Sequence, residues 1–234
     1  KTKMLIICSP SNPTGNVYTQ DELNALAEVV KKHDDMYVLS DEIYEHINYV
    51  GFKASIAAAP DMKDRTIICN GVSKAYAMTG WRLGWVAAPE WIIKGMNKLQ
   101  GQYTSGTNDV AQRAALAAYK GDQQCVEDMR VAFQRRRDLI VKLAKEIPGL
   151  EVNVPQGAFY LFPHCKKLFG KSYGDYTINT STDFAMYLLQ EAHVATVAGD
   201  AFGEPDGFRM SYATSDDNIR EALRRIKEAC EKLK

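Results

Sequence analysis

A single lysine stands between two apolar runs in the first third of the sequence. Lys74 follows the run Thr66-Ile67-Ile68-Cys69 and precedes the run from Leu83 to Ala88, and both runs are typical of buried strands. A lysine held near the end of a buried strand lies where α/β domains bind their ligands. Burial favours the neutral amine, which attacks carbonyl groups, so the position predicts an imine with an aldehyde. For this stretch alone, a solvent-exposed lysine in a simple strand–loop–strand connection remains the alternative.

Polar side chains also follow the other predicted strands. Asn12 comes after the apolar run Met4 to Cys8, Asp41 and Tyr44 follow the run Tyr37 to Ser40, and Arg82 stands eight residues after Lys74. The ends of successive parallel strands open onto one edge of a sheet. We therefore expect these side chains to lie together with Lys74.

This set of groups suits a cofactor that carries an aldehyde, a basic ring nitrogen and a phosphate. Lys74 would form the imine, and Asp41 would keep the ring nitrogen protonated so that the ring withdraws electrons. Tyr44 and Asn12 would bond the phenolic oxygen of the ring, and Arg82 would pair with the phosphate as a fork. The cofactor with these features is pyridoxal 5'-phosphate.

The elements that must position these groups follow an α/β order. Strand, helix, strand, loop, strand and strand succeed one another, which predicts a mostly parallel sheet with helices on its faces. Thr19 and Glu22 form a capping box for a helix that runs to about Lys32. Pro89 opens a second helix, the segment from Gln100 to Thr107 is predicted to be a loop, and Asn108 caps a third helix that ends at Gly121.

The second half of the chain has a different character. A long helix is predicted from about Gln123 to Glu146, and its arginines are interpreted as a solvated face. Short strands are predicted at 151–154, 158–162, 194–197 and 208–212, with helices at 182–191 and 215–233. We expect a small α+β domain at 128–234 after a large cofactor-binding domain at 1–127, with the boundary inside the long helix.

The composition narrows the class of protein. The chain has 29 basic and 29 acidic residues, which gives no electrostatic reason to bind nucleic acid or an anionic membrane. No apolar run has the length of a membrane helix. The five cysteines are odd in number and widely spaced, which predicts a reducing, cytoplasmic compartment, and neither cysteines nor histidines have the spacing of metal ligands.

Four motifs occur in one order along almost the whole chain. They are Ser11-Asn12-Pro13-Thr14-Gly15, Ser40-Asp41-Glu42-Ile43-Tyr44, Ser73-Lys74 with Gly80-Trp81-Arg82-Leu83-Gly84, and Phe208-Arg209-Met210-Ser211-Tyr212-Ala213-Thr214-Ser215. In these motifs the chain resembles the class I and II aminotransferases, pyridoxal-phosphate enzymes of fold type I. Its likeness is greatest to the bacterial aspartate aminotransferases, a subgroup that also includes aromatic and prephenate aminotransferases.

The resemblance implies a role for each matching residue. Lys74 is similar to the lysine that holds the cofactor as an imine and acts as general base, with Asp41 and Tyr44 as its partners on the ring. Arg82 and Ser73 match phosphate ligands. Arg209 and Asn12 match the groups that bind the substrate, with Arg209 holding the α-carboxylate. The family also implies an amino acid and a 2-oxo acid as substrates, and a homodimer of the full-length protein.

The sequence departs from the family at two points. Many members carry Ser or Thr three residues before the lysine, where this chain has Gly71. The chain also begins at Lys1, directly before a predicted core strand, and lacks the N-terminal part that supplies a phosphate loop and much of the substrate pocket. We expect a C-terminal portion of an aminotransferase.

Three alternatives to an aspartate aminotransferase that uses 2-oxoglutarate stay open. Lys74, Asp41 and Arg209 would also serve an aromatic or prephenate aminotransferase, or a lyase that cleaves a β substituent. A pyridoxal-phosphate-binding effector domain of a transcriptional regulator is the third, and it predicts a helix-turn-helix region upstream of Lys1.

Overall fold

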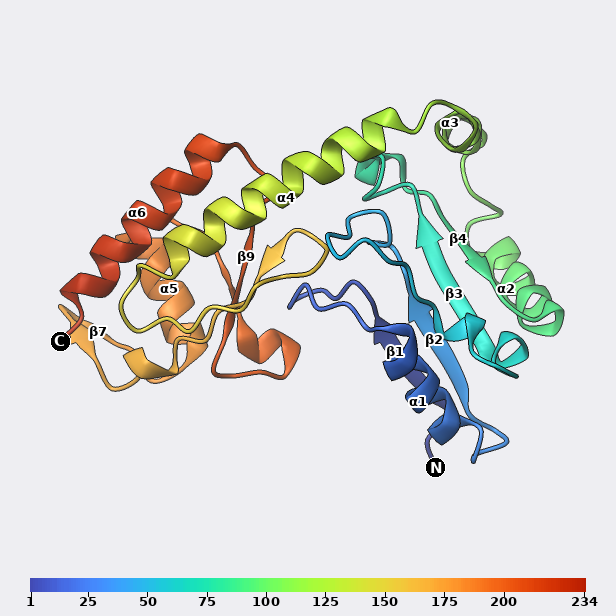
Figure 1. The fold of residues 1–234 in the computed structure, drawn as a ribbon, viewed down its shortest axis with the longest axis horizontal. Helices are drawn as coiled ribbons and strands as arrows, with labels where there is room; N and C mark the ends of the chain where they lie inside the picture. Colours follow the sequence, from blue (N-terminus) through green and yellow to red (C-terminus); the bar gives the residue numbers. More distant parts are fainter. The chain divides into compact units, whose positions relative to one another are not determined.

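The computed structural model describes residues 1–234, which form two compact units (Figure 1). The first unit comprises Lys1–Ser11 and Asn16–Arg130, and the second comprises Asn12–Gly15 and Val131–Lys234. The first contains β1 (Met4–Cys8), α1 (Gln20–Val30), β2 (Tyr37–Asp41), β3 (Thr66–Gly71), β4 (Gly84–Ala87), α2 (Glu90–Tyr103), α3 (Asp109–Lys120) and the start of α4 (Gln124–Ala144). The second contains the rest of α4, β5 (Tyr160–Leu161), β6 (Ser172–Tyr173), β7 (Tyr176–Thr177), α5 (Ser181–Glu191), β8 (Val197–Ala198), β9 (Phe208–Ser211) and α6 (Asp216–Lys232).

The first unit is built on a four-stranded sheet in the order β1-β2-β3-β4. The pairs β1–β2 and β2–β3 are parallel, and β3–β4 is antiparallel. A parallel neighbour requires a crossover connection, usually a helix, and only a loop with one 3₁₀ turn (Thr79–Trp81) joins β3 to β4. The expected α/β fold with a mostly parallel sheet is confirmed.

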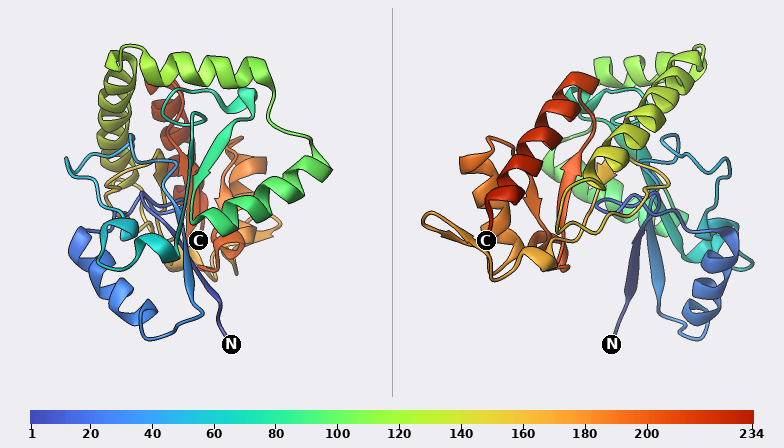
Figure 2. Two further views of the ribbon diagram at one scale, coloured as in Figure 1. Left: turned by 90° about the vertical axis from the view of Figure 1, so that its right-hand side faces the viewer. Right: turned by 60° about the vertical axis from the view of Figure 1, so that its left-hand side comes forward.

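Helices α1 and α2 lie on opposite sides of this sheet (Figure 2). Thr19 and Glu22 form the predicted capping box of α1, whose buried Leu23 and Ala27 pack in one core cluster with Val38 of β2. On the other side, Trp91 of α2 meets the ring of Tyr37 edge-on, with 5.6 Å between the ring centroids. The sheet therefore holds its strand ends between two helical layers.

The predicted loop from Gln100 to Thr107 is wrong in its first half. Helix α2 continues to Tyr103, and the amide of Thr104 donates to the carbonyl of Gln100 at its end. The glutamines in this segment are good helix formers, which outweighs the single Gly101. Most of the apolar side of α2 is exposed, with Leu99 at 64%.

The second unit packs two helices on a small antiparallel sheet in the order β5-β9-β8, beside the hairpin β6–β7. Helix α5 is capped by Thr180 with Asp183 and meets the sheet through Phe184 against Phe208, with 5.1 Å between the ring centroids. The hydroxyl of Tyr187 donates to the carbonyl of Ala229 at 2.8 Å and ties α5 to α6. Both helices are visible beside β9 in Figure 2.

Three sequence predictions for the second unit fail. The strand predicted at 194–197 forms only at Val197–Ala198. No strand forms at 151–154, where only Glu151 pairs with His164, because Pro155 cannot donate to a ladder and its neighbourhood packs against residues 14 and 15 instead. The basic run of α4 is not a solvated face throughout. The side chain of Arg137 is 14% exposed and donates to the carbonyl of Pro155, and Arg135 and Arg136 pair with Asp216 of α6.

None of the helices combines the length and the apolar character that a membrane span requires.

Candidate functional site

The turn after β2 carries the predicted carboxylate and phenol. Asp41 is the last residue of β2, and its Oδ1 accepts the amide of Ile43 at 3.2 Å, which fixes the carboxylate against its own turn. Asp41 pairs in register with Cys8 on one side and Cys69 on the other, so these three residues share one face of the sheet. Burial, and secondarily the charge of Asp41, raises the pKa of the Cys69 thiol. Tyr44 closes the turn and is only 3% exposed.

The structure brings Lys74 to this turn. Lys74 follows β3 by three residues and is half-buried, and its Nζ lies 5.7 Å from the centroid of the Tyr44 ring. That distance is within the range of a cation–π contact. Ser73, which directly precedes it, is also half-buried. The predicted lysine and the predicted phenol are therefore neighbours although they are 30 positions apart in the sequence.

The connection from Lys74 to β4 contains two residues in the left-handed backbone region. Ala77 has φ of 52° and Arg82 has φ of 53°. Such conformations cost energy in residues other than glycine and cluster at functional sites. Arg82 is exposed, and its Nη1 donates to the carbonyl of Thr79 at 3.0 Å.

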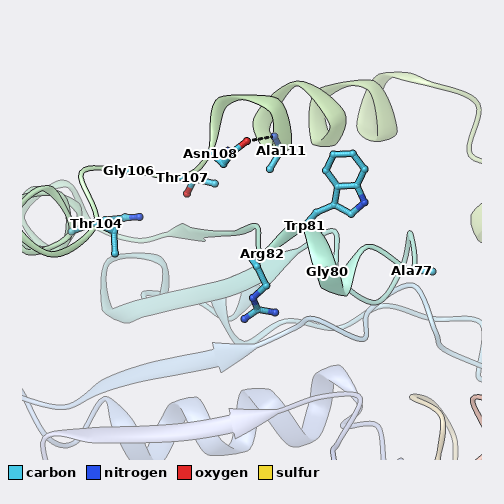
Figure 3. Close-up of a pocket in the computed structure, with 10 residues that line it drawn as sticks. Ala77, Gly80, Trp81, Arg82, Thr104, Gly106, Thr107, Asn108 and Ala111 are labelled. Atoms are coloured by element: carbon cyan, nitrogen blue, oxygen red, sulfur yellow. Dashed lines mark hydrogen bonds between the residues drawn. The ribbon is translucent and has the colours of Figure 1, made fainter.

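Arg82 lines an open cavity of about 740 Å³ at the start of α3 (Figure 3). Thr107 and Asn108 form another part of its wall, and Asn108 caps α3 through the amide of Ala111 at 3.1 Å. In Figure 3 the side chains of Trp81 and Arg82 point to opposite sides of the 3₁₀ turn. Of the predicted cofactor groups, Arg82 is among the residues that line this cavity, and Lys74, Asp41 and Tyr44 are not.

The structure explains why position 71 is a glycine. Gly71 pairs with Gly84 across β3 and β4, and a Cβ on Gly71 would lie 2.9 Å from the Cα of Gly84 and 2.9 Å from the carbonyl oxygen of Leu83. A serine or threonine would require the two strands to move apart. The departure from the family pattern is therefore built into the strand pairing.

Arg209 and Asn12 meet in the second unit. Arg209 stands on β9, and its Nη1 donates to Oδ1 of Asn12 at 2.8 Å. The guanidinium carbon lies 4.6 Å from the Tyr160 ring centroid and 5.0 Å from that of Phe202. The two rings and the amide fix the plane of the guanidinium. The amide nitrogen of Asn12 is left to donate to another group.

The loop that carries Asn12 is anchored within the same unit. The amides of Gln156 and Gly157 both donate to the carbonyl of Gly15, at 2.8 and 2.9 Å, and the side chain of Asn153 donates to the carbonyl of Thr14 at 3.0 Å. Gly15 has φ of +72°, and a Cβ there would lie 2.5 Å from Cβ of Pro155. Only glycine meets both conditions, so the Asn-Pro-Thr-Gly motif is a docking segment as well as the carrier of Asn12.

Sequence reasoning missed several neighbours of these groups. Nothing in the sequence indicates that the rings of Tyr160 and Phe202 both lie against the guanidinium of Arg209. Asn70 and Glu45 carried no signal beyond their places beside Lys74 and Tyr44, yet they join the two strand ends with a hydrogen bond. The polar loop before Asn108 was the one useful indication of the Arg82 cavity.

Comparison with known proteins identifies the family. The family described as aminotransferase class I and II matches residues 1–226. The chain is 45% identical over 236 residues to the aspartate aminotransferase of Rhizobium meliloti, and 46% identical over 233 residues to the aspartate/prephenate aminotransferase of Cereibacter sphaeroides. These matches cover 100% and 98% of this chain and 58% of each relative, so the chain spans less than two thirds of their length.

A solved structure agrees with these matches. The crystal structure of the aspartate aminotransferase from Rhizobium meliloti is similar with a TM-score of 0.96 at 45% identity, and the match covers 100% of this chain and 59% of that one. The chain therefore belongs to the class I and II aminotransferases, a family of enzymes that depend on pyridoxal 5'-phosphate.

Proposed function

We propose that the protein to which this chain belongs transfers an amino group between an amino acid and a 2-oxo acid. The observation that carries the proposal is the Lys74 amine over the Tyr44 ring, beside the turn that fixes the Asp41 carboxylate. Pyridoxal phosphate requires an amine that can form an imine, and here a phenol and a carboxylate lie beside that amine in one turn.

The residues of the chain fit this cofactor. Oδ1 of Asp41 is engaged by Ile43, which leaves Oδ2 to hold a protonated ring nitrogen. Tyr44 and the amide nitrogen of Asn12 would hold the phenolic oxygen. Arg82 and Ser73 would hold the phosphate, with the strained backbone of Arg82 setting the direction of its side chain. The bound cofactor supplies an electron sink that makes the Cα proton of an attached amino acid acidic.

Lys74 has two tasks in this proposal. Its Nζ would hold the cofactor, and as a free amine it would take the proton from the substrate Cα and later give that proton up again. The contact with Tyr44 keeps the amine near the reacting atoms. The same residue acts in the reverse half-reaction with the 2-oxo acid.

Arg209 would bind the α-carboxylate of the substrate. Its guanidinium can donate to both carboxylate oxygens as a fork, and its contacts with the rings of Tyr160 and Phe202 fix the plane of that fork. Asn12 accepts one of the N–H groups of Arg209 Nη1, and the remaining N–H groups of the guanidinium can bind the substrate.

Aspartate is the amino donor that we propose, with 2-oxoglutarate as acceptor. A relative at 45% identity is named an aspartate aminotransferase, which supports this choice. Prephenate is the second candidate for the 2-oxo acid that accepts the amino group, because a relative at 46% identity is named an aspartate/prephenate aminotransferase.

Three organisational proposals accompany the function. The large domain spans 1–127 and the small domain 128–234, with the boundary inside α4. The full-length protein is a homodimer, by likeness to its family. Its location is cytoplasmic, which the free thiols of all five cysteines support.

The experiment that tests the function is a product assay with the full-length protein and pyridoxal phosphate. We expect oxaloacetate from aspartate and 2-oxoglutarate, with no ammonia released, and loss of this activity in Lys74→Ala. Arg209→Lys should raise the KM for the amino acid by at least about tenfold, because lysine lacks the bidentate fork. Ammonia release without oxo-acid exchange would establish a lyase instead.

A further inference from the structure

The two segments that carry the predicted cofactor groups leave the sheet at the same level. The pairing of β2 with β3 ends at Asp41 and Cys69, and the last backbone bond between them runs from the amide of Glu42 to the carbonyl of Cys69 at 2.9 Å. Beyond this point one segment continues to Tyr44 and the other to Lys74. No β-ladder joins them there, so their spacing depends on side chains.

One side-chain hydrogen bond spans this gap. Nδ2 of Asn70 donates to Oε1 of Glu45 at 2.8 Å. Asn70 is 7% exposed, and its Oδ1 accepts the amide of Gly71 at 2.7 Å, so both ends of its amide are engaged. Asn70 stands four residues before Lys74, and Glu45 directly follows Tyr44. The bond therefore joins the same two segments as the contact between Lys74 and Tyr44.

Glu45 is held in the form that accepts this bond. Its carboxylate also lies 3.3 Å from Nε2 of His46 and 3.7 Å from Nζ of Lys53. The hydrogen bond with His46 is the largest of the effects that lower the pKa of Glu45, and burial opposes it. An amide that donates to an ionised carboxylate makes a stronger bond than one that donates to a neutral oxygen. The Asn70–Glu45 bond is thus a firm link rather than a surface contact.

We propose that Asn70 and Glu45 are positioning residues that set the distance and direction of the Lys74 amine relative to Tyr44 and Asp41. The inference rests on the proposed function, because the groups that Asn70 and Glu45 would place are those proposed to hold the cofactor and to take the proton from the substrate. Proton transfer is sensitive to small displacements of the base. Partners behind the reacting groups are the means by which such placement is maintained.

The test uses the full-length protein with Asn70→Ala, Glu45→Ala and the double variant. Two measurements are made on each: the pH midpoint of the absorbance change of lysine-bound pyridoxal phosphate, and amide hydrogen exchange over residues 70–76 without cofactor. Glu45→Gln keeps an acceptor for Asn70, and Lys53→Ala removes a different partner of Glu45. These two serve as matched controls.

We expect both alanine variants to bind the cofactor with a pH midpoint shifted by about half a unit or more, since one unit corresponds to 1.36 kcal/mol between protonation states. Exchange over 70–76 should be at least about fivefold faster, because that segment loses its anchor to the turn. The double variant should shift no further than the single ones, since both remove the same bond. Glu45→Gln, which keeps a neutral and therefore weaker acceptor, should shift the midpoint less than Glu45→Ala, and Lys53→Ala should keep the midpoint of the unchanged protein.

Different results would overturn the positioning role of Asn70 and Glu45 and the proposed function. An unshifted midpoint in Glu45→Ala and Asn70→Ala, with a lower melting temperature alone, would make the bond merely structural and overturn the inference. Additive shifts in the double variant would do the same. If Asn70→Ala does not fold, Glu45→Ala decides, because Glu45 is the more exposed partner. A full-length protein whose cofactor absorbance is unaffected by Lys74→Ala would overturn the proposed function itself.

Discussion

Replacement of Gly71 by alanine tests the closest approach of two strands beneath the predicted site. The added Cβ would lie 2.9 Å from the Cα of Gly84, 2.9 Å from the carbonyl oxygen of Leu83 and 3.5 Å from Cδ1 of Ile43. The first two are backbone atoms, which cannot swing aside as a side chain would. The strands β3 and β4 must therefore separate.

The expected loss of stability follows from two opposing effects. Overpacking a well-packed region costs about 1–3 kcal/mol. Alanine in place of glycine restricts the unfolded chain and offsets this by about 0.4–1 kcal/mol. The net loss is about 1–2 kcal/mol. At about 2–4 °C per kcal/mol for a protein of this size, the melting temperature should fall by about 2–8 °C.

The assay is thermal unfolding followed by circular dichroism, with Gly95→Ala as the matched control. Gly95 lies inside α2, and an added Cβ there would have no atom within 4 Å. Alanine is favoured over glycine in a helix interior by up to about 1 kcal/mol, so the control should melt at a slightly higher temperature. A Gly71→Ala variant that melts as high as the unchanged protein would refute the argument from the strand approach.

Three further predictions concern other parts of the chain. Thr180→Ala removes the capping box of α5 and should lower the free energy of unfolding by about 1 kcal/mol in urea titrations, whereas Thr182→Ala should leave the box intact. Tyr187→Phe removes the hydroxyl that donates to the carbonyl of Ala229 and should lower the free energy of unfolding by about 1 kcal/mol. In the unchanged protein, burial raises the pKa of Tyr187 to about 12, so the absorbance change of this phenol should appear only when the protein unfolds. Burial raises the pKa of Glu42 above 4.5, although hydrogen bonds from Ser55 and Ser40 oppose the shift. The carboxyl therefore binds a proton more readily in the folded state than in the unfolded state, and the folded state loses stability as the pH rises above 4.5. Glu42→Gln should therefore gain stability relative to the unchanged protein between pH 4.5 and neutrality, and a constant difference across that range would contradict the sign.

Local patterns in the sequence predicted the parts of the fold that depend on neighbouring residues. The capping box of Thr19 and Glu22 begins α1 and Asn108 caps α3, both as expected, and the helix predicted from residue 215 forms with Ser215 as its cap. Lys74, Tyr44 and Asp41 were predicted to lie together because each follows an apolar run, where parallel strands deliver side chains to one edge, and the structure places Lys74 beside Tyr44.

Features that depend on distant packing were beyond the sequence. Nothing near Arg137 indicates that it donates to the carbonyl of Pro155, and nothing in the run around Glu151 indicates that the amides of Gln156 and Gly157 donate to Gly15. The link between Asn70 and Glu45 joins residues 25 positions apart, and it is evident only when β2 and β3 are placed side by side. Periodicity describes one element at a time, and these contacts exist only between elements.

The central claim is that Lys74 binds pyridoxal phosphate covalently. The most direct measurement is reduction of the full-length protein with borohydride in the presence of the cofactor, followed by mass spectrometry of its peptides. We expect the peptide containing Lys74 to carry the reduced cofactor and no other lysine to carry it. Labelling of a different lysine, with Lys74 unmodified, would contradict it.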